Sequence, residues 1–128
     1  MRWSRAALLA IGVAAHPARA YAAPADNLAS LWRTLGACAT LDGVPPGAVG
    51  SEVTVLFSLK RDGSLLGQPR ITHSRLVGTG DEQRGFIAAA LGAVSRCLPM
   101  AITDGLGGAI AGRPLSLRLT SKKPERAL

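Results

Sequence analysis

The sequence predicts an α+β domain in which a three-stranded antiparallel sheet packs on helix. Apolar residues recur at helical spacing in two segments and alternate with polar residues in three others. These segments follow one another in the order helix, strand, strand, helix, strand. The chain has 128 residues, of which 48% are hydrophobic, so we expect one compact domain rather than a disordered tail or a multidomain enzyme.

The first helix is expected to be capped by Asp26 or Asn27 and to stop at Gly36. Its apolar positions follow the spacing i, i+3, i+4 and i+7, and they are Leu28, Leu31, Trp32 and Leu35. Residues 42–51 contain two prolines and three glycines, which predicts a loop.

The strongest strand pattern spans Glu52 to Leu59, where every second residue is apolar. The Asp62-Gly63 pair predicts a hairpin turn, and a second strand is expected from about Leu65 to Ser74. Gly67 and Pro69 within it indicate an edge strand with a bulge.

The second helix is expected to begin with a capping box formed by Thr79 and Glu82, and to end before Pro99. Its apolar stripe consists of Phe86, Ala89, Ala90, Ala93, Val94 and Cys97. Residues 99–112 hold four glycines and predict an irregular loop, or a loop with one helical turn. A last strand should run from Arg113 to Thr120, before a frayed polar tail.

An all-antiparallel sheet with these connections requires the strand order second, first, third. The first strand is then central, which agrees with its lack of Gly and Pro. One face packs on helix, and the other is expected to be open unless the N-terminal helix crosses it. The open face would carry Thr54, Ser58, Gln68, Arg70, Thr72, Ser116 and Arg118.

Residues 1–22 have the basic, apolar and small-residue parts of a secretory signal, which predicts cleavage after Ala22 and a single domain over residues 23–128. The apolar run Ala6 to Ala15 is short against the roughly 20 residues that span a bilayer, although a retained anchor is the alternative. Cleavage would leave 12 basic and 8 acidic residues, so the formal net charge would fall from +7 to +4. The expected location is the periplasm.

Cys38 and Cys97 are the only cysteines, and an exported protein enters an oxidising compartment. We therefore expect a disulfide between them, which would stabilise the fold by roughly 4 kcal/mol by restricting the unfolded chain. The alternative is a reactive thiol, but neither a Cys-x-x-Cys motif nor an electropositive setting is visible.

No pattern for catalysis, a metal or a cofactor emerges. His73 is the only histidine after residue 22, is in phase with Ile71, and has no Gly-x-Ser-x-Gly motif to accompany it. The acidic residues match local roles in turns and helix caps, and the glycine pairs lack phosphate-loop spacing. We expect no catalytic residues, no metal and no cofactor.

Nucleic-acid binding is not expected, because the remaining aromatic residues Trp32, Phe57 and Phe86 fall on stripes predicted to be buried. The arginines indicate a solvated basic surface, or a surface for an acidic partner or lipid head group.

The segment Gly50 to Ser74 reads V-x-V-x-F-x-L-x-x-D-G and then P-x-I-x-x-S, and an Ala-rich helix follows that ends at Cys97. This set of motifs resembles the C-terminal domains of TonB and TolA over roughly residues 28–120. The resemblance implies a noncatalytic periplasmic module that binds other envelope proteins, in some cases by pairing a sheet edge with a partner's strand. TonB and TolA proteins carry an anchor and a long spacer before this domain, and only five residues lie between Ala22 and Leu28.

A soluble adaptor in envelope transport or integrity is therefore the expected function. The alternatives are a small periplasmic ligand-binding or enzymatic domain and a signal-anchored energy transducer. The favoured binding edge is the last strand, because Pro69 removes a donor from the other edge. Its candidate residues are Arg113, Ser116, Arg118 and Thr120. The arginines would attract acidic partners or merely keep the edge soluble, and the open face around Arg70 and Thr72 is the next candidate.

Overall fold

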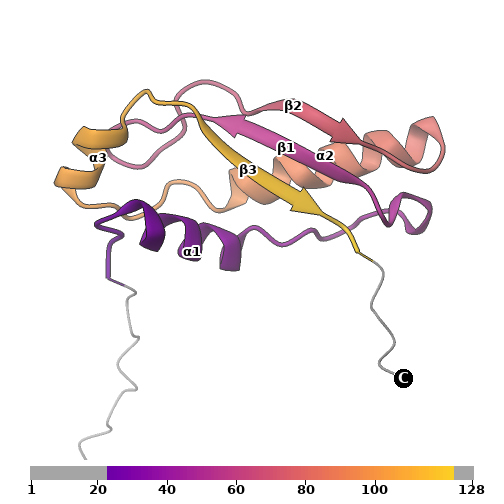
Figure 1. Ribbon diagram of the computed structural model, residues 1–128, viewed down its shortest axis with the longest axis horizontal. Helices are drawn as coiled ribbons and strands as arrows, with labels where there is room; N and C mark the ends of the chain where they lie inside the picture. Colours follow the sequence, from indigo (N-terminus) through magenta and orange to yellow (C-terminus); the bar gives the residue numbers. More distant parts are fainter. Residues whose placement is uncertain (1–22, 123–128) are drawn as a thin grey trace, which may run out of the picture.

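The protein is an α+β domain, with a three-stranded antiparallel sheet and its longest helix across one face of that sheet (Figure 1). The structure is a computed structural model that describes residues 23–122. Its elements are α1 (Leu28–Cys38), the 3-10 turn η1 (Pro46–Ala48), β1 (Glu52–Phe57), β2 (Arg70–Arg75), α2 (Gly80–Arg96), α3 (Asp104–Ile110) and β3 (Leu115–Thr120). The strand order is β2-β1-β3, so the predicted fold class is confirmed.

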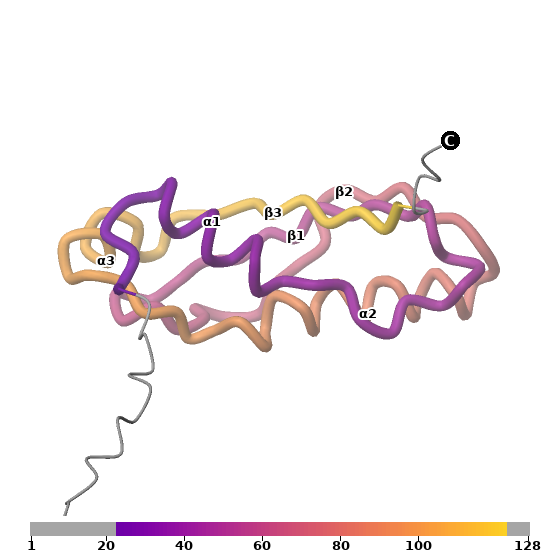
Figure 2. Tube along the Cα trace, turned by 90° about the horizontal axis from the view of Figure 1, so that it is seen from below, coloured from indigo at the N-terminus to yellow at the C-terminus, as the bar shows by residue number. Residues whose placement is uncertain are grey.

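The sheet and α2 form two layers, and α1 lies on the β3 side of the molecule (Figures 1 and 2). Every second residue of β1 is buried, as are the apolar residues of α2 that face the sheet. Trp32 of α1 meets Phe57 of β1 edge to face, with ring centroids 6.5 Å apart. Because α1 packs on the buried side, it leaves the other face of the sheet open.

The register between β1 and β3 is uninterrupted, whereas a bulge breaks the register between β1 and β2. Thr54 lies opposite His73 and Val55 opposite Ile71, so Thr72 is the extra residue. A bulge reverses the alternation of side chains along its strand. His73 therefore lies on the open face, and the prediction that it is in phase with Ile71 is wrong. β2 is an edge strand as predicted, but its bulge is at Thr72 rather than at Gly67 or Pro69.

Both helix starts follow the predicted caps. Asn27 accepts a hydrogen bond from the Ser30 N–H, and Thr79 with Glu82 forms the capping box of α2. The predicted end of α1 at Gly36 is wrong, because the helix continues to Cys38. A single glycine costs a helix only about 1 kcal/mol, which the packing of α1 offsets.

The strand bounds are shorter than predicted at the hairpin. Leu59 forms a single bridge with Leu65, and the chain then leaves the sheet until Arg70. Between Leu59 and Leu65, the Lys60 N–H donates to the Ser64 carbonyl, and the Asp62 carboxylate accepts from the Ser64 N–H. The Asp-Gly turn is thus confirmed. Pro69 has no backbone N–H, and because it lies before β2 it removes no hydrogen bond from the sheet.

Residues 99–112 were expected to form an irregular loop or a loop with one helical turn, and they contain a longer helix, α3, of 7 residues. Thr103 caps this helix by accepting a hydrogen bond from the Leu106 N–H. Leu106 and Ile110 are one turn apart and buried, so tertiary packing compensates for the low helix propensity of the three glycines.

Cys38 and Cys97 form a disulfide, with their Cα atoms 5.9 Å apart, which confirms the predicted pairing. It joins the end of α1 to the residue that caps α2. In the part of the chain that the structure describes, no helix has the length and hydropathy to cross a membrane. The predicted signal over residues 1–22 and most of the predicted tail lie outside the described residues.

Candidate interaction surface

The outer edge of β3 presents unpaired backbone groups. The Ser121 N–H donates to the Ser51 carbonyl, and these residues lie opposite each other one step beyond the paired strands. Hydrogen-bonded pairs alternate along an antiparallel ladder, so Leu119, Leu117 and Leu115 also direct their backbone groups to β1. The backbone groups of Ser116, Arg118 and Thr120 therefore point away from the sheet. None of them bonds to the backbone of another segment within residues 23–122.

Arg118 does not offer a free charge at this edge. Its Nε donates to the Glu52 carboxylate of β1, and the two residues sit diagonally across neighbouring strands. The hydrogen bond and the positive charge of Arg118 lower the pKa of Glu52, and Arg75 and His73 contribute smaller electrostatic effects in the same direction. The Arg118 guanidinium neutralises Glu52, and the Arg118 side chain is 70% exposed.

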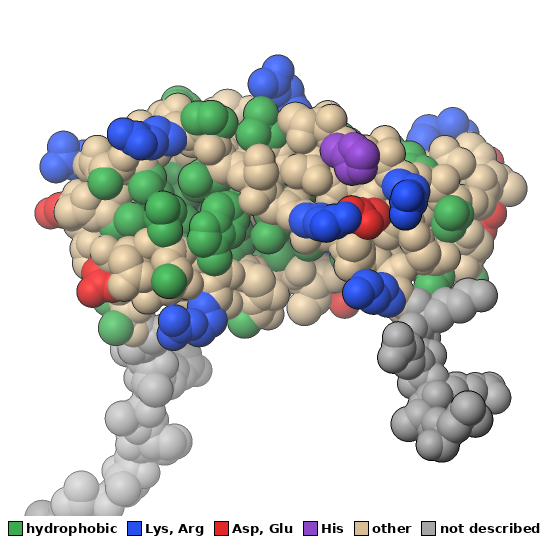
Figure 3. Space-filling view, viewed as in Figure 1, with side chains coloured by type: hydrophobic (Ala, Val, Ile, Leu, Met, Phe, Trp, Pro, Cys, Tyr) green, Lys and Arg blue, Asp and Glu red, His purple; other side chains and the backbone are tan. Residues whose placement is uncertain are grey.

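The open face of the sheet is basic beside this pair. Thr54 faces His73 and Leu56 faces Arg70 across β1 and β2, and Glu52 faces Arg75. Figure 3 shows the histidine, basic side chains and an acidic one together on one half of this face. Arg70 also lines a hollow of about 230 Å³ beside the hairpin. Thr72 is exposed, and its hydroxyl lies 3.5 Å from the Thr54 carbonyl. This surface adjoins the β3 edge through the Arg118–Glu52 pair.

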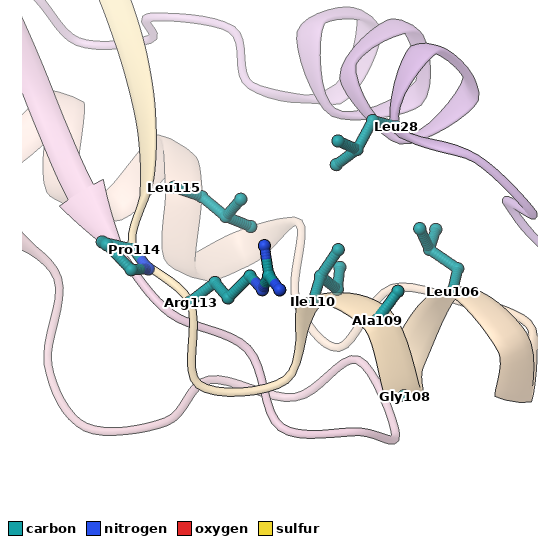
Figure 4. Close-up of a pocket in the computed structure, with 8 residues that line it drawn as sticks. All are labelled: Leu28, Leu106, Gly108, Ala109, Ile110, Arg113, Pro114 and Leu115. Carbon is teal, nitrogen blue, oxygen red and sulfur yellow. The ribbon is translucent and has the colours of Figure 1, made fainter.

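Arg113 lies before β3 rather than within it, which corrects the predicted start of the strand. Its N–H donates to the Ile110 carbonyl at the end of α3. Its side chain lines a pocket of about 620 Å³ between α1, α3 and the start of β3 (Figure 4). The four predicted residues thus divide into Ser116, Arg118 and Thr120 on the free edge and Arg113 at the pocket.

Sequence reasoning missed this pocket. Leu28 belongs to the apolar stripe of α1, yet it is 45% exposed and lines the pocket instead of the core. Figure 3 shows the corresponding hollow of apolar side chains between α3 and α1. The sequence did hold a signal for α3. Leu106 and Ile110 are four residues apart, and Thr103 precedes them, which together is typical of a capped helix.

No group of three or more His, Cys, Asp or Glu side chains that could hold a metal ion occurs in the described residues. His73 is exposed on β2, and neither oxygen of the nearby Glu52 is bonded to it. The backbone of the β3 edge is suited to pairing with another strand, and the side chains around it offer charge and apolar contact.

The fold and this surface define a small disulfide-bonded α+β domain with an unpaired edge along β3. The family model described as "Uncharacterised conserved protein UCP034077" matches residues 21–123, and the chain belongs to this family. No curated protein matches the chain, and no solved structure does so either.

Proposed function

We propose that this chain is an exported, noncatalytic interaction module that binds an envelope protein in the periplasm as a soluble adaptor. The observation that carries the proposal is the row of outward backbone groups at Ser116, Arg118 and Thr120. Such a row is a template for an extended segment of another protein, which completes the missing hydrogen bonds. The expected resemblance to TonB and TolA C-terminal domains agrees with this mode of binding.

The other edge supports the same choice. β2 is interrupted by a bulge, and bulges are devices that protect edges from pairing. β3 has no bulge within Leu115–Thr120, and its register with β1 is regular. A proline precedes each strand, Pro69 before β2 and Pro114 before β3, so the bulge is what distinguishes the two edges. The β3 edge is therefore the better template.

The disulfide supports export, because such bonds persist in oxidising compartments and are rare in the cytosol. The basic open face beside β3 favours a partner whose strand carries acidic residues.

Photo-crosslinking in cells tests the proposal. A photoreactive amino acid at Ser116 should give an adduct with one envelope protein, identified by mass spectrometry. The matched position is Ser95, which is exposed on α2, away from β3. Absence of an adduct from Ser116, or the same adducts from Ser95, would contradict binding at the β3 edge.

A further inference from the structure

The pocket at the start of β3 has the size and form of a small-molecule site. Its volume of about 620 Å³ lies in the range of roughly 300–1,000 Å³ that is typical of ligand pockets. Side chains from three separate elements line it: Leu28 from α1, Leu106 and Ile110 from α3, and Leu115 from β3. Figure 4 shows these side chains around one shared space.

The lining is mostly apolar, and Leu28 is a large apolar side chain of it that solvent reaches. Leu106, Ile110 and Leu115 are each at most 8% exposed, so they form the buried floor of the pocket. Leu28 is 45% exposed above that floor. A ligand that covers Leu28 would remove apolar surface from water, which is favourable at about 25 cal/mol per Å².

Arg113 is the only charged side chain in this lining. Figure 4 shows it extending between Leu115 and Ile110, toward the space below Leu28. It forms no ion pair with any residue in the range 23–122, and no carboxylate lines the pocket. An arginine offers a planar set of donors that fits a carboxylate, and its attraction is stronger next to apolar surface than in open water.

We propose that this pocket binds a small carboxylate with an unbranched apolar chain, the chemistry of a fatty acid. The carboxylate pairs with the Arg113 guanidinium, and the chain lies over Leu106 and Ile110 under Leu28. A cationic amphiphile has the same apolar chain but is repelled by Arg113. This inference goes beyond the proposed function, because it needs neither the β3 edge nor a protein partner.

The test is a titration of the isotope-labelled, disulfide-bonded protein, followed by two-dimensional NMR. The probes are sodium decanoate below its micelle-forming concentration, decyltrimethylammonium with the opposite charge, and acetate without the chain. Decanoate should shift the amide signals of Ile110, Arg113 and Leu115 in a saturable way. Acetate should leave them unchanged, and the cation should bind at least about tenfold more weakly. Equal binding of decanoate and the cation would overturn the proposal.

Three variants separate the pocket from general surface charge. R113Q should weaken decanoate binding by about tenfold or more, the size expected when a charged hydrogen bond is lost. R96Q removes an exposed arginine at the end of α2, outside the pocket, and should bind decanoate as the wild type does. Ala109 is exposed and lines the pocket, so A109D should fold and repel the carboxylate. Unchanged binding by folded R113Q and A109D would refute the site, whatever the outcome of the crosslinking at Ser116.

Discussion

At the residue scale, three surface carboxylates are held by hydrogen bonds that lower their pKa values. The Thr79 backbone N–H is the main cause at Glu82, and the backbone N–H of Gly47 adds to it. Hydrogen bonds from the Ser64 hydroxyl and N–H lower the pKa of Asp62, and the hydrogen bond from Arg118 lowers the pKa of Glu52. Each ionised carboxylate therefore anchors a specific turn, helix start or strand pair.

These pKa shifts predict a loss of stability in acid. A carboxyl whose pKa is lower in the folded state than in the unfolded state stabilises the fold above the unfolded pKa. Unfolded values are near 4.3 for Glu and 3.9 for Asp, so the stability should fall as the pH drops below about 4. Urea unfolding at pH 7, 5 and 3 measures this dependence. E52Q and R118Q should each flatten it, because either variant removes the same ion pair; a slope equal to that of the wild type would contradict the assignment.

Two glycines of α3 should respond to alanine in opposite directions. A Cβ at Gly107 would collide with the backbone carbonyl of Arg61, so Gly107→Ala should destabilise the protein by about 1–3 kcal/mol. A Cβ at Gly105 meets nothing within 4 Å, so Gly105→Ala should stabilise the helix by about 0.5–1 kcal/mol. The free energy of unfolding of the two variants provides the comparison. Equal effects would show that the close approach of Arg61 to α3 is absent.

At the element scale, the local signals and the elements agree where the pattern is strong. The alternation in β1, the Thr79–Glu82 capping box and the Asp62-Gly63 turn are each local to a few residues, and all three are confirmed. The fold class follows from their order. The length of α3 was underestimated because its glycines disfavour a helix and its stability comes from buried contacts with distant segments, which no short window contains.

The disulfide between the ends of α1 and α2 should contribute a substantial part of the stability, which is roughly 5–15 kcal/mol for a typical domain. Its separation of 59 residues makes the expected loss about 4 kcal/mol when both cysteines are replaced by alanine. The measurement is urea unfolding of the double variant against the oxidised wild type. Thiol titration of the denatured, unreduced wild type should find no reactive thiol; two thiols per chain, or a loss below about 1 kcal/mol, would contradict the bond's role.

Amide hydrogen exchange should show the free edge of β3 directly. The amides of Leu117 and Leu119 are bonded to β1 and should exchange slowly, whereas those of Ser116 and Arg118 point outward and should exchange fast. NMR exchange rates of these four residues test the alternation. Slow exchange at Ser116 in the isolated protein would mean that the edge is already covered.

At the scale of the whole molecule, the surface features arise from elements that are distant in sequence. The bulge at Thr72 places His73 on the open face, and the diagonal pair of Arg118 with Glu52 joins residues 66 positions apart. The pocket needs α1, α3 and the start of β3 together. Sequence patterns indicate which residues face inward, but these juxtapositions depend on register and on how the layers meet. The free β3 edge could be predicted, and the pocket beside it could not.

The central claim is that a partner binds along the β3 edge. Its most direct test is to measure how tightly the partner captured through Ser116 binds the Ser116→Pro variant. Ser116→Pro removes one outward N–H and leaves the ladder with β1 intact, so circular dichroism should show a native fold. Leu117→Pro, by contrast, removes a bond to β1 and should lose stability. We expect the folded Ser116→Pro variant to bind the partner about tenfold more weakly, since a backbone hydrogen bond is lost and the ring obstructs pairing. A native Ser116→Pro protein with unchanged affinity would contradict binding through the β3 edge.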